Sequence, residues 1–348
     1  MKNALVTGGA GFIGSHVVER LLRDGWGVRV LDNFSSGTSA NLERAEGVEI
    51  ERGDVRDPEA CQRACRGTDA VFHLAAIASV QVSIDKPVLA HDVNLGGTLN
   101  MLLAARDQGV RRFVFSSSAS VYGNSTVLPT TEGLPLIPQS PYASGKACGE
   151  FYCRHFWDLF GLETVVLRYF NVFGPRQDAR SGYAAVIPRF VEAATAGAAP
   201  VVFGDGGQTR DFVYVGNVAD ANLRAATAPC AAGGVFNVGG GTQISLLDLL
   251  EALGGVTGRR LKPEFLPARA GEVYHSRADI SGAREVLGYE PTLTLAEGLA
   301  HTLAWASCEA AGLAVDRAAS ASSMQEPGVE LKRGPAPQRS MTSVVAPQ

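Results

Sequence analysis

The sequence has no excess of basic residues and no long apolar run, and both absences narrow its function. The 348 residues include 31 Lys and Arg against 35 Asp and Glu, which gives a formal net charge of −4. The chain therefore lacks the basic field that draws proteins to nucleic acid. No apolar run approaches the roughly 18 residues that span a bilayer. We expect neither nucleic acid nor a membrane among its partners.

The sequence also lacks paired cysteine and histidine motifs. Its six cysteines form no C-x-x-C pair, and no two histidines stand at zinc-ligand spacing. We expect reduced thiols that pack as small hydrophobes, and no metal. Residues Met1–Thr7 look like a buried strand that enters a glycine loop without a cleavage site, which is not typical of a signal peptide. The sequence thus predicts a cytoplasmic protein.

Short apolar runs alternate with longer helical patterns through the first half of the chain. Phe12–Arg23 and Val88–Gln108 have helical patterns. The predicted buried strands cover residues 4–7, 28–31, 48–51, 70–74, 113–116 and 165–169. Repeated strand–helix units predict an α/β fold with a doubly wound parallel sheet.

Beyond about residue 170 the alternation becomes irregular. We expect a first lobe over residues 1–170 and a smaller C-terminal lobe over 171–315, with the chain crossing between them at about 170–240. A last helix is predicted over Thr294–Leu313. From residue 316 the composition shifts to Ala, Ser, Pro, Gln and Gly without apolar periodicity, which predicts a disordered tail over 316–348.

A glycine loop follows the first predicted strand. Gly8, Gly11 and Gly14 permit a tight turn and close backbone approach to a pyrophosphate at a helix N-terminus. Asp32 ends the next strand, 18 residues after Gly14, where a carboxylate binds ribose hydroxyls and repels a 2′-phosphate. The pattern favours NAD over NADP. Asp54 and Val55 end the third strand, where they either contact adenine or form a simple turn.

Tyr142 and Lys146 stand four residues apart. On a helix they share one face. An ammonium beside a phenol favours the phenolate, so we expect Lys146 to lower the pKa of Tyr142 from about 10. A base of that kind can take a proton from a sugar hydroxyl.

Together these motifs resemble the extended short-chain dehydrogenase/reductase superfamily, in its NAD-dependent epimerase/dehydratase branch, over roughly residues 1–312. The resemblance implies a Rossmann-type fold whose smaller lobe binds a UDP-sugar. The run Ser116–Gly123 is similar to that of UDP-hexose 4-epimerases, so Ser118 would bond the sugar O4 beside Tyr142. Ser120 would position the sugar. Related dehydratases carry an Asp-Glu pair where this chain has Ala119-Ser120, which argues against water elimination.

The same resemblance implies the residues that bind NAD. Tyr169 would flank the nicotinamide, and Lys146 would bond its ribose. Ala78 departs from relatives that carry a Lys at this point. The implied set is Gly8, Gly11, Phe12, Ile13, Gly14, Asp32, Asn33, Asp54, Val55, Leu74, Ala75, Ala76, Tyr142, Lys146 and Tyr169. His73, next to this set, is expected to have no proton-transfer role.

The resemblance also implies a UDP-sugar site. Asn171, Arg210 and Arg269 would bind the diphosphate, because guanidinium offers forked donors to phosphate oxygens. Glu272 would bind the uridine ribose. Ser276 falls where a bulky residue excludes an N-acetyl group at C2, so a serine leaves room for one.

The expected activity is therefore NAD-dependent epimerisation at C4 of a UDP-hexose through a transient 4-keto sugar. UDP-N-acetylglucosamine and UDP-N-acetylgalactosamine are the favoured pair. A UDP-glucose/UDP-galactose epimerase, a UDP-glucuronate epimerase or decarboxylase, and a non-catalytic nucleotide-binding regulator remain alternatives. Helices near residues 88–108 and 142–160 resemble the pair with which family members form a homodimer.

Overall fold

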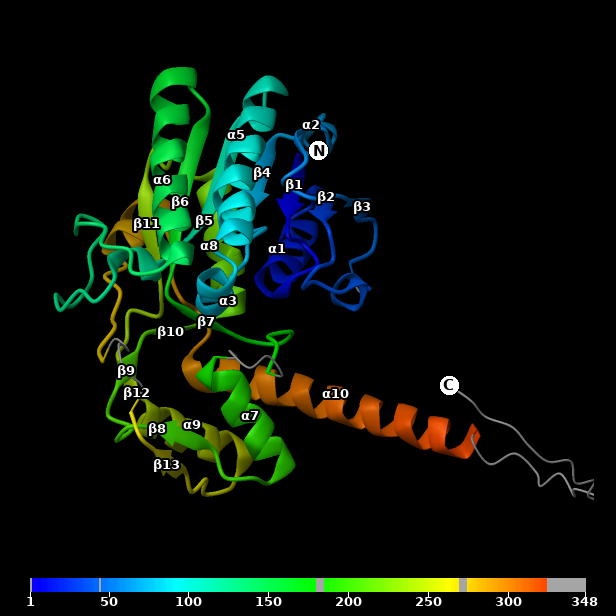
Figure 1. The fold of residues 1–348 in the computed structure, drawn as a ribbon, viewed down its shortest axis with the longest axis vertical. Coiled ribbons are helices and arrows are strands. Elements are labelled where there is room, and N and C mark those ends of the chain that lie inside the picture. The colour runs from blue at the N-terminus through cyan, green and yellow to red at the C-terminus, as the bar shows by residue number, and fades with distance from the viewer. Residues whose placement is uncertain (1, 44, 180–184, 269–273, 324–348) are drawn as a thin grey trace, which may run out of the picture. The chain divides into compact units, whose positions relative to one another are not determined.

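A seven-stranded parallel sheet forms the centre of the protein (Figure 1). The structure is a computed structural model that describes residues 2–43, 45–179, 185–268 and 274–323. The strand order is β11-β6-β5-β4-β1-β2-β3. The strands are β1 (Asn3–Thr7), β2 (Gly27–Asp32), β3 (Glu49–Arg52), β4 (Ala70–His73), β5 (Arg112–Ser118), β6 (Glu163–Tyr169) and β11 (Val235–Val238). The predicted doubly wound α/β fold is confirmed.

Helices cover both faces of this sheet. One face packs against α1 (Phe12–Arg23) and α8 (Val215–Thr227), and these two helices also contact each other. The other face packs against α2 (Pro58–Cys65), α5 (Gly97–Asp107) and α6 (Pro141–Phe160). Ahead of α5 lie α3 (Val80–Asp85), α4 (Pro87–His91) and a π-helical turn, η2 (Asp92–Gly96).

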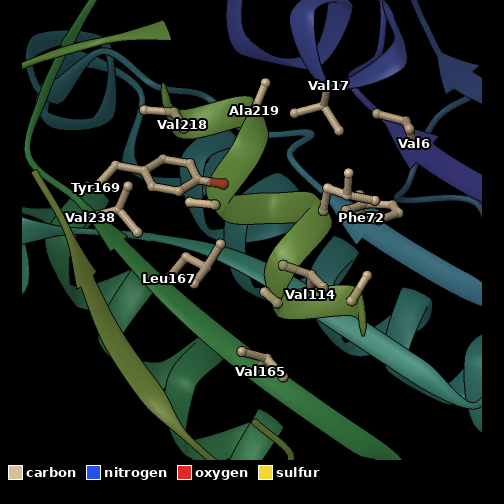
Figure 2. Packing of buried hydrophobic residues seen from close by; sticks show 14 of the residues in the cluster. Val6, Val17, Phe72, Val114, Val165, Leu167, Tyr169, Val218, Ala219 and Val238 are labelled. Carbon is tan, nitrogen blue, oxygen red and sulfur yellow. The ribbon is translucent and has the colours of Figure 1, made fainter. Parts of the chain in front are cut away.

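The core follows from the alternation of side chains along the strands. On β1, Leu5 faces the α5 side and Val6 faces the α1 side, and neither side chain is exposed. Figure 2 shows part of the α1–α8 layer, where Tyr169 of β6 lies beside Val218 of α8. Because both faces of the sheet are covered, the central strands β1, β4 and β5 are buried almost throughout, whereas the edge strand β3 has the sequence Glu-Ile-Glu-Arg and is largely exposed.

The second half of the chain adds short two-stranded sheets. β7 (Asn171–Phe173) pairs with β10 (Phe212–Tyr214), β9 (Thr209–Arg210) with β12 (Ile244–Ser245), and β8 (Val201–Phe203) with β13 (Glu264–Leu266). Helices α7 (Val186–Ala196) and α9 (Leu246–Thr257) complete this region, which has its own apolar cluster. Ser245 and Asp248 form a capping box at the start of α9.

Residues 2–307 belong to one compact unit, and the division into two lobes near residue 170 stays a prediction. The last helix, α10, runs over Leu295–Ser323. Helix α10 thus extends beyond the predicted end at Leu313, and the disordered tail expected over 316–348 stays a prediction. Residues 324–348 lie outside the described part of the chain. Among the described residues, no helix has the length and apolar character needed to cross a membrane.

Candidate active site

The glycine loop brings the start of α1 against the neighbouring strand end. Gly8 has a φ of +68°, and a Cβ there would lie 2.8 Å from the Ala75 nitrogen. A Cβ on Gly14 would lie 2.1 Å from the Gly8 carbonyl oxygen. Only glycine permits both the left-handed turn and this close packing. The loop therefore leaves its backbone open at the carboxyl ends of β1 and β4, where Rossmann-type sheets bind ligands.

Asp32 ends β2 beside this loop. Its Oδ2 accepts a hydrogen bond from the Ala10 nitrogen at 2.9 Å, and its Oδ1 accepts one from the Phe34 nitrogen at 2.8 Å. These bonds fix the carboxylate at the loop. Asn33 donates to Asp54 Oδ2 at 2.8 Å, which joins the ends of β2 and β3.

These residues line one cavity of about 460 Å³. All fifteen predicted NAD-binding residues are on its wall: Gly8, Gly11, Phe12, Ile13, Gly14, Asp32, Asn33, Asp54, Val55, Leu74, Ala75, Ala76, Tyr142, Lys146 and Tyr169. The cavity thus runs past the ends of several adjacent strands to the Tyr142 helix. The residues present fit NAD, because glycine backbone, a ribose-binding carboxylate and the Tyr/Lys pair follow one another along a single wall.

Arg56 also lines this cavity, and the sequence did not predict it. Its guanidinium forms an ion pair with Asp54 at 2.7 Å. That pair holds the pKa of Asp54 well below its usual range. The place of Arg56 two residues after Asp54 could have indicated this ion pair, because an Arg so close to a carboxylate at a strand end can form an ion pair with it.

The Tyr142 helix begins at a well-defined cap. Ser140 Oγ accepts from the Ala143 nitrogen at 3.1 Å, and Ser83 Oγ of α3 accepts from the Tyr142 nitrogen at 3.1 Å. Lys146 follows one turn later and is buried. Its Nζ donates to the Ser116 carbonyl oxygen at 2.7 Å and lies 5.0 Å from the Phe115 ring centre.

Burial controls the pKa values of this pair. It lowers the pKa of Lys146 to about 8, and raises that of Tyr142, against which the hydrogen bond to Ser118 acts. The expectation that Lys146 lowers the pKa of Tyr142 is therefore wrong for this structure. The physical reason is that desolvation penalises the phenolate, while the ammonium is directed at the Ser116 carbonyl.

The serine run ends β5 and turns toward a second cavity. Ser118 Oγ accepts from the Ser120 nitrogen at 3.2 Å. Ser116 Oγ bonds the Tyr169 hydroxyl at 3.0 Å, and Asn222 of α8 bonds the same hydroxyl at 2.8 Å. Ser120 Oγ is buried without a hydrogen-bond partner, so it is a polar atom ready for a ligand.

The second cavity, of about 240 Å³, is called the polar cavity below because most of its lining residues have polar side chains, Ala119, Gly123 and Phe170 being the exceptions. Of the residues predicted to bind substrate, Ser118, Ser120, Asn171, Arg210 and Ser276 are on its wall. Its wall also includes Tyr122, Ser125, Thr130, Tyr169 and His275. Ser125 and Thr130 could not be found from the sequence, because they lie in a loop without a recognisable motif.

Shared residues join this cavity to its neighbours. Tyr169 lines both the NAD-type cavity and the second cavity. Asn171 and Arg210 line the second cavity and a third, of about 270 Å³, which also includes Phe190, Phe203 and other apolar residues. Arg269 and Glu272, predicted for the diphosphate and the ribose, lie outside the described residues.

His73 is a core residue. Its Nδ1 pairs with Thr7 Oγ1 at 2.8 Å and its Nε2 with Thr98 Oγ1 at 3.0 Å. Burial lowers its pKa to about 3, so it stays neutral at physiological pH. Among the described residues, no group of three or more His, Cys, Asp or Glu side chains is placed to hold a metal ion.

Known proteins are similar to this chain in sequence and in fold. A model of the NAD dependent epimerase/dehydratase family matches residues 4–239. The UDP-glucose 4-epimerase of Mycolicibacterium smegmatis is 45% identical over 304 residues, which cover 86% of this chain and 96% of that protein. The UDP-N-acetylglucosamine 4-epimerase of Methanobrevibacter ruminantium M1, solved with UDP-N-acetylmuramic acid, is 40% identical with a TM-score of 0.85, covering 88% of this chain and 99% of that one. The UDP-glucose 4-epimerase of Thermus thermophilus, solved with NAD, is 39% identical with a TM-score of 0.77, covering 87% and 98%.

Proposed function

This chain belongs to the NAD-dependent epimerase/dehydratase family, and from that premise we propose that it interconverts UDP-N-acetylglucosamine and UDP-N-acetylgalactosamine at C4. The chain is an NAD-dependent isomerase of UDP-hexoses. One observation carries the proposal. Tyr142 and Lys146 line the NAD-type cavity, Ser118 lines the polar cavity, and the Ser118 side chain hydrogen-bonds Tyr142 where the two meet.

In this mechanism Tyr142 moves the proton. The ionised phenolate form of Tyr142 would take the proton from the sugar O4, while Ser118 holds the sugar O4 through a hydrogen bond. Bound NAD supplies the acceptor and donor of the C4 hydride. Lys146 keeps a positive charge beside the reacting centre and bonds the nicotinamide ribose. Tyr142 then returns the proton to O4 after the flat 4-keto sugar has turned in the pocket.

The rest of the site holds the nucleotide while the sugar turns. Arg210 and Asn171 stand between the polar cavity and the third cavity, at the position that a diphosphate would occupy between sugar and uridine. Forked guanidinium donors suit phosphate oxygens. Arg269 and Glu272 complete this proposed set. The orphan hydroxyl of Ser120 gives the sugar a further partner within the same cavity.

The choice of an N-acetylated sugar rests on Ser276. Its side chain lines the polar cavity, where a small residue leaves volume for a C2 substituent. A UDP-glucose/UDP-galactose epimerase is the second candidate, favoured by the 45% identical relative named above. A UDP-glucuronate epimerase or decarboxylase is a third candidate, since relatives at about 33% identity have those names.

The experiment that separates these candidates is a product analysis. Purified protein is incubated separately with UDP-N-acetylglucosamine, UDP-glucose and UDP-glucuronate, and the products are resolved chromatographically. We expect the 4-epimer of the first substrate to form fastest, without net NADH or CO₂. Faster conversion of UDP-glucose would move the assignment to the second candidate. No turnover of any sugar would favour a nucleotide-binding regulator.

We also propose a homodimer. Six apolar side chains on α3, α4 and α6 are between 43% and 72% exposed: Val80, Ile84, Val88, Phe151, Leu159 and Phe160. Helix α6 covers the predicted interface segment 142–160, whereas the predicted segment 88–108 begins in α4 and continues through η2 and α5. Helix α6 contacts both α3 and α4. Clustered exposed apolar side chains are typical of an interaction surface. The cytoplasmic location expected from the sequence stays a prediction.

A further inference from the structure

Asp211 is a fully buried carboxylate that receives three backbone hydrogen bonds. Its Oδ1 accepts from the Gly240 nitrogen at 2.6 Å, and its Oδ2 accepts from the nitrogens of Gly241 at 3.1 Å and Ala278 at 2.9 Å. The first two donors belong to the turn after β11, and the third lies two residues beyond Ser276. One side chain thus ties two separate segments together.

The backbone of Asp211 reaches a further segment. Its carbonyl oxygen accepts from the Asn171 nitrogen at 3.0 Å and from Asn171 Nδ2 at 3.2 Å. Arg210 is its neighbour in the chain. Asp211 therefore connects the segments that carry Asn171, Arg210 and Ser276, all of which line the polar cavity. Asp211 itself is not on the wall of that cavity, so any effect on a ligand passes through these neighbours.

We propose that Asp211 is a positioning residue whose ionised carboxylate holds the Ser276 segment and the Gly240 turn in place, so that UDP-sugar binding depends on its charge. This inference rests on the proposed function. A protonated carboxyl has an O–H donor in place of one acceptor site, so it cannot accept three N–H groups as well as the ionised form does. The hydrogen bond to Ala278 is then weakened, and Ser276 shifts with it.

Other contacts limit the size of this effect. Tyr274 O accepts from the Thr209 nitrogen at 2.9 Å, and Arg277 O accepts from the Thr130 nitrogen at 2.8 Å, on either side of Ser276. These bonds retain the segment near the cavity when Asp211 is protonated. We therefore expect weakened binding of the sugar nucleotide and not its abolition.

The surroundings of Asp211 set the pH at which its carboxylate is protonated. Burial raises the pKa of Asp211 to about 6, while the three N–H donors and the positive charge of Arg277 act in the opposite direction. The other titratable or charged groups near it are His275 and Asp279 on the Ser276 segment, Arg210 beside it, and Tyr289, whose hydroxyl donates to Gly239 O.

Protonation of Asp211 is expected to weaken binding of the sugar nucleotide, but it has the opposite effect on the stability of the fold. A carboxyl whose pKa is raised in the folded state binds its proton more tightly there than in the unfolded chain. Between about pH 4 and pH 6, acidification therefore stabilises the fold through Asp211. Weaker binding near pH 5 cannot then be attributed to unfolding caused by this residue.

The test is a calorimetric titration of the NAD-loaded protein with UDP-N-acetylglucosamine between pH 5 and pH 8. Both phosphates of this probe are esterified, so its charge stays constant over that range. We expect the affinity to fall by about tenfold as the pH drops through about 6, the equivalent of one charge-assisted hydrogen bond. In Asp211→Asn, affinity should be weaker at pH 8 and independent of pH. KM should rise more than kcat falls, and NAD retention should be unchanged.

Two control variants isolate Asp211. Asp248→Asn removes a carboxylate from the capping box of α9, so it destabilises the same region without contacting the Ser276 segment; its pH profile should match the wild type. His275→Gln removes the imidazole next to Ser276, which lines the same cavity. A positive charge at this position would strengthen binding of an anion, which is opposite to the effect expected from protonation of Asp211.

The outcomes separate the two proposals. If the wild type binds the probe with the same affinity at pH 5 and pH 8, the role of Asp211 is overturned while the proposed function stands. The same holds if Asp211→Asn keeps the wild-type profile, or if His275→Gln abolishes it. If the wild type fails to bind or convert any UDP-sugar, the proposed function itself fails. Should Asp211→Asn not fold, the wild-type and His275→Gln profiles still decide the question.

Discussion

Replacing Lys146 with Met should abolish turnover and yet make the protein more stable at neutral pH. The Lys146 side chain is 4% exposed, and burial lowers its pKa from 10.5 to about 8. At about 1.4 kcal/mol for each pKa unit, holding this charged group in the folded state costs about 3 kcal/mol. The variant also loses the hydrogen bond to the Ser116 carbonyl, worth about 1 kcal/mol. The net expectation is a gain of about 2 kcal/mol in the free energy of unfolding.

The sign of the pH dependence makes this prediction specific. Between about pH 8 and pH 10.5 the unfolded chain holds a proton at this lysine that the folded protein has released, so stability rises with pH across that window. Below pH 8 the penalty is present in full. The advantage of Lys146→Met should therefore be largest at pH 7 and should shrink as the pH approaches 10.

The assay is urea unfolding of cofactor-stripped protein at pH 7 and pH 10, because bound NAD would add its own binding energy to the folded state. Lys262→Met replaces an exposed lysine and serves as the matched control. Its difference from the wild type in the free energy of unfolding should be the same at pH 7 and pH 10. Lower stability of Lys146→Met at pH 7, or an advantage that does not change with pH, would refute the reasoning.

Four further predictions concern the proposed roles. Tyr142→Phe should fold and retain NAD but lose about 10²–10⁴ in turnover, the range for removal of a general acid/base; near-normal turnover in a coupled assay would exclude Tyr142 as the base. Asp32→Ala should weaken NAD retention and reduce the preference for NAD over NADP; tighter binding of NADP than of NAD by the wild type would contradict the role of Asp32. Ser276→Tyr should block UDP-N-acetylglucosamine by steric overlap while UDP-glucose still turns over; full activity on the first sugar would mean that Ser276 does not face C2. Light scattering at micromolar concentration should give the mass of a dimer, and a monomer mass would rule out the proposed interface.

The cofactor cavity could be predicted from the sequence because its residues lie at strand ends. Parallel strands align their carboxyl ends, so Gly8, Asp32, Asp54 and Ala75, distant in sequence, had to meet along one edge of the sheet. The glycine spacing and the alternating apolar runs were sufficient for that inference. The wall of the cavity includes every residue predicted for it, although its occupation by NAD in the predicted manner stays a proposal.

The sequence did not show how deeply the site's side chains are buried or toward which atoms they point. The spacing of Tyr142 and Lys146 gave their shared helix face, but not that Lys146 Nζ donates to Ser116 O or that desolvation raises the pKa of Tyr142. The role of Asp211 was hidden for the same reason. Its three donors are backbone N–H groups, and two of them, Gly240 and Ala278, are 38 positions apart and match no motif.

The second half of the chain was harder to predict because its strands are short. β9 and β12 have two residues each, which is too few for a period of two to be visible. The Ser245 cap of α9 could be predicted because it depends on two side chains three residues apart. The extension of α10 to Ser323 was missed because helix propensity acts without apolar periodicity.

Three cavities follow one another through the shared residues Tyr169, Asn171 and Arg210, so the site favours a ligand long enough to fill all of them. Under the proposed function, a ligand with its sugar beside Tyr142 would be held by a diphosphate at Arg210 and a flat ring among the apolar residues of the third cavity. A free hexose would fill the first position and leave the other two empty. Recognition would then be set mainly by parts of the substrate that undergo no reaction, and the hexose, held at one end only, would be free to rotate.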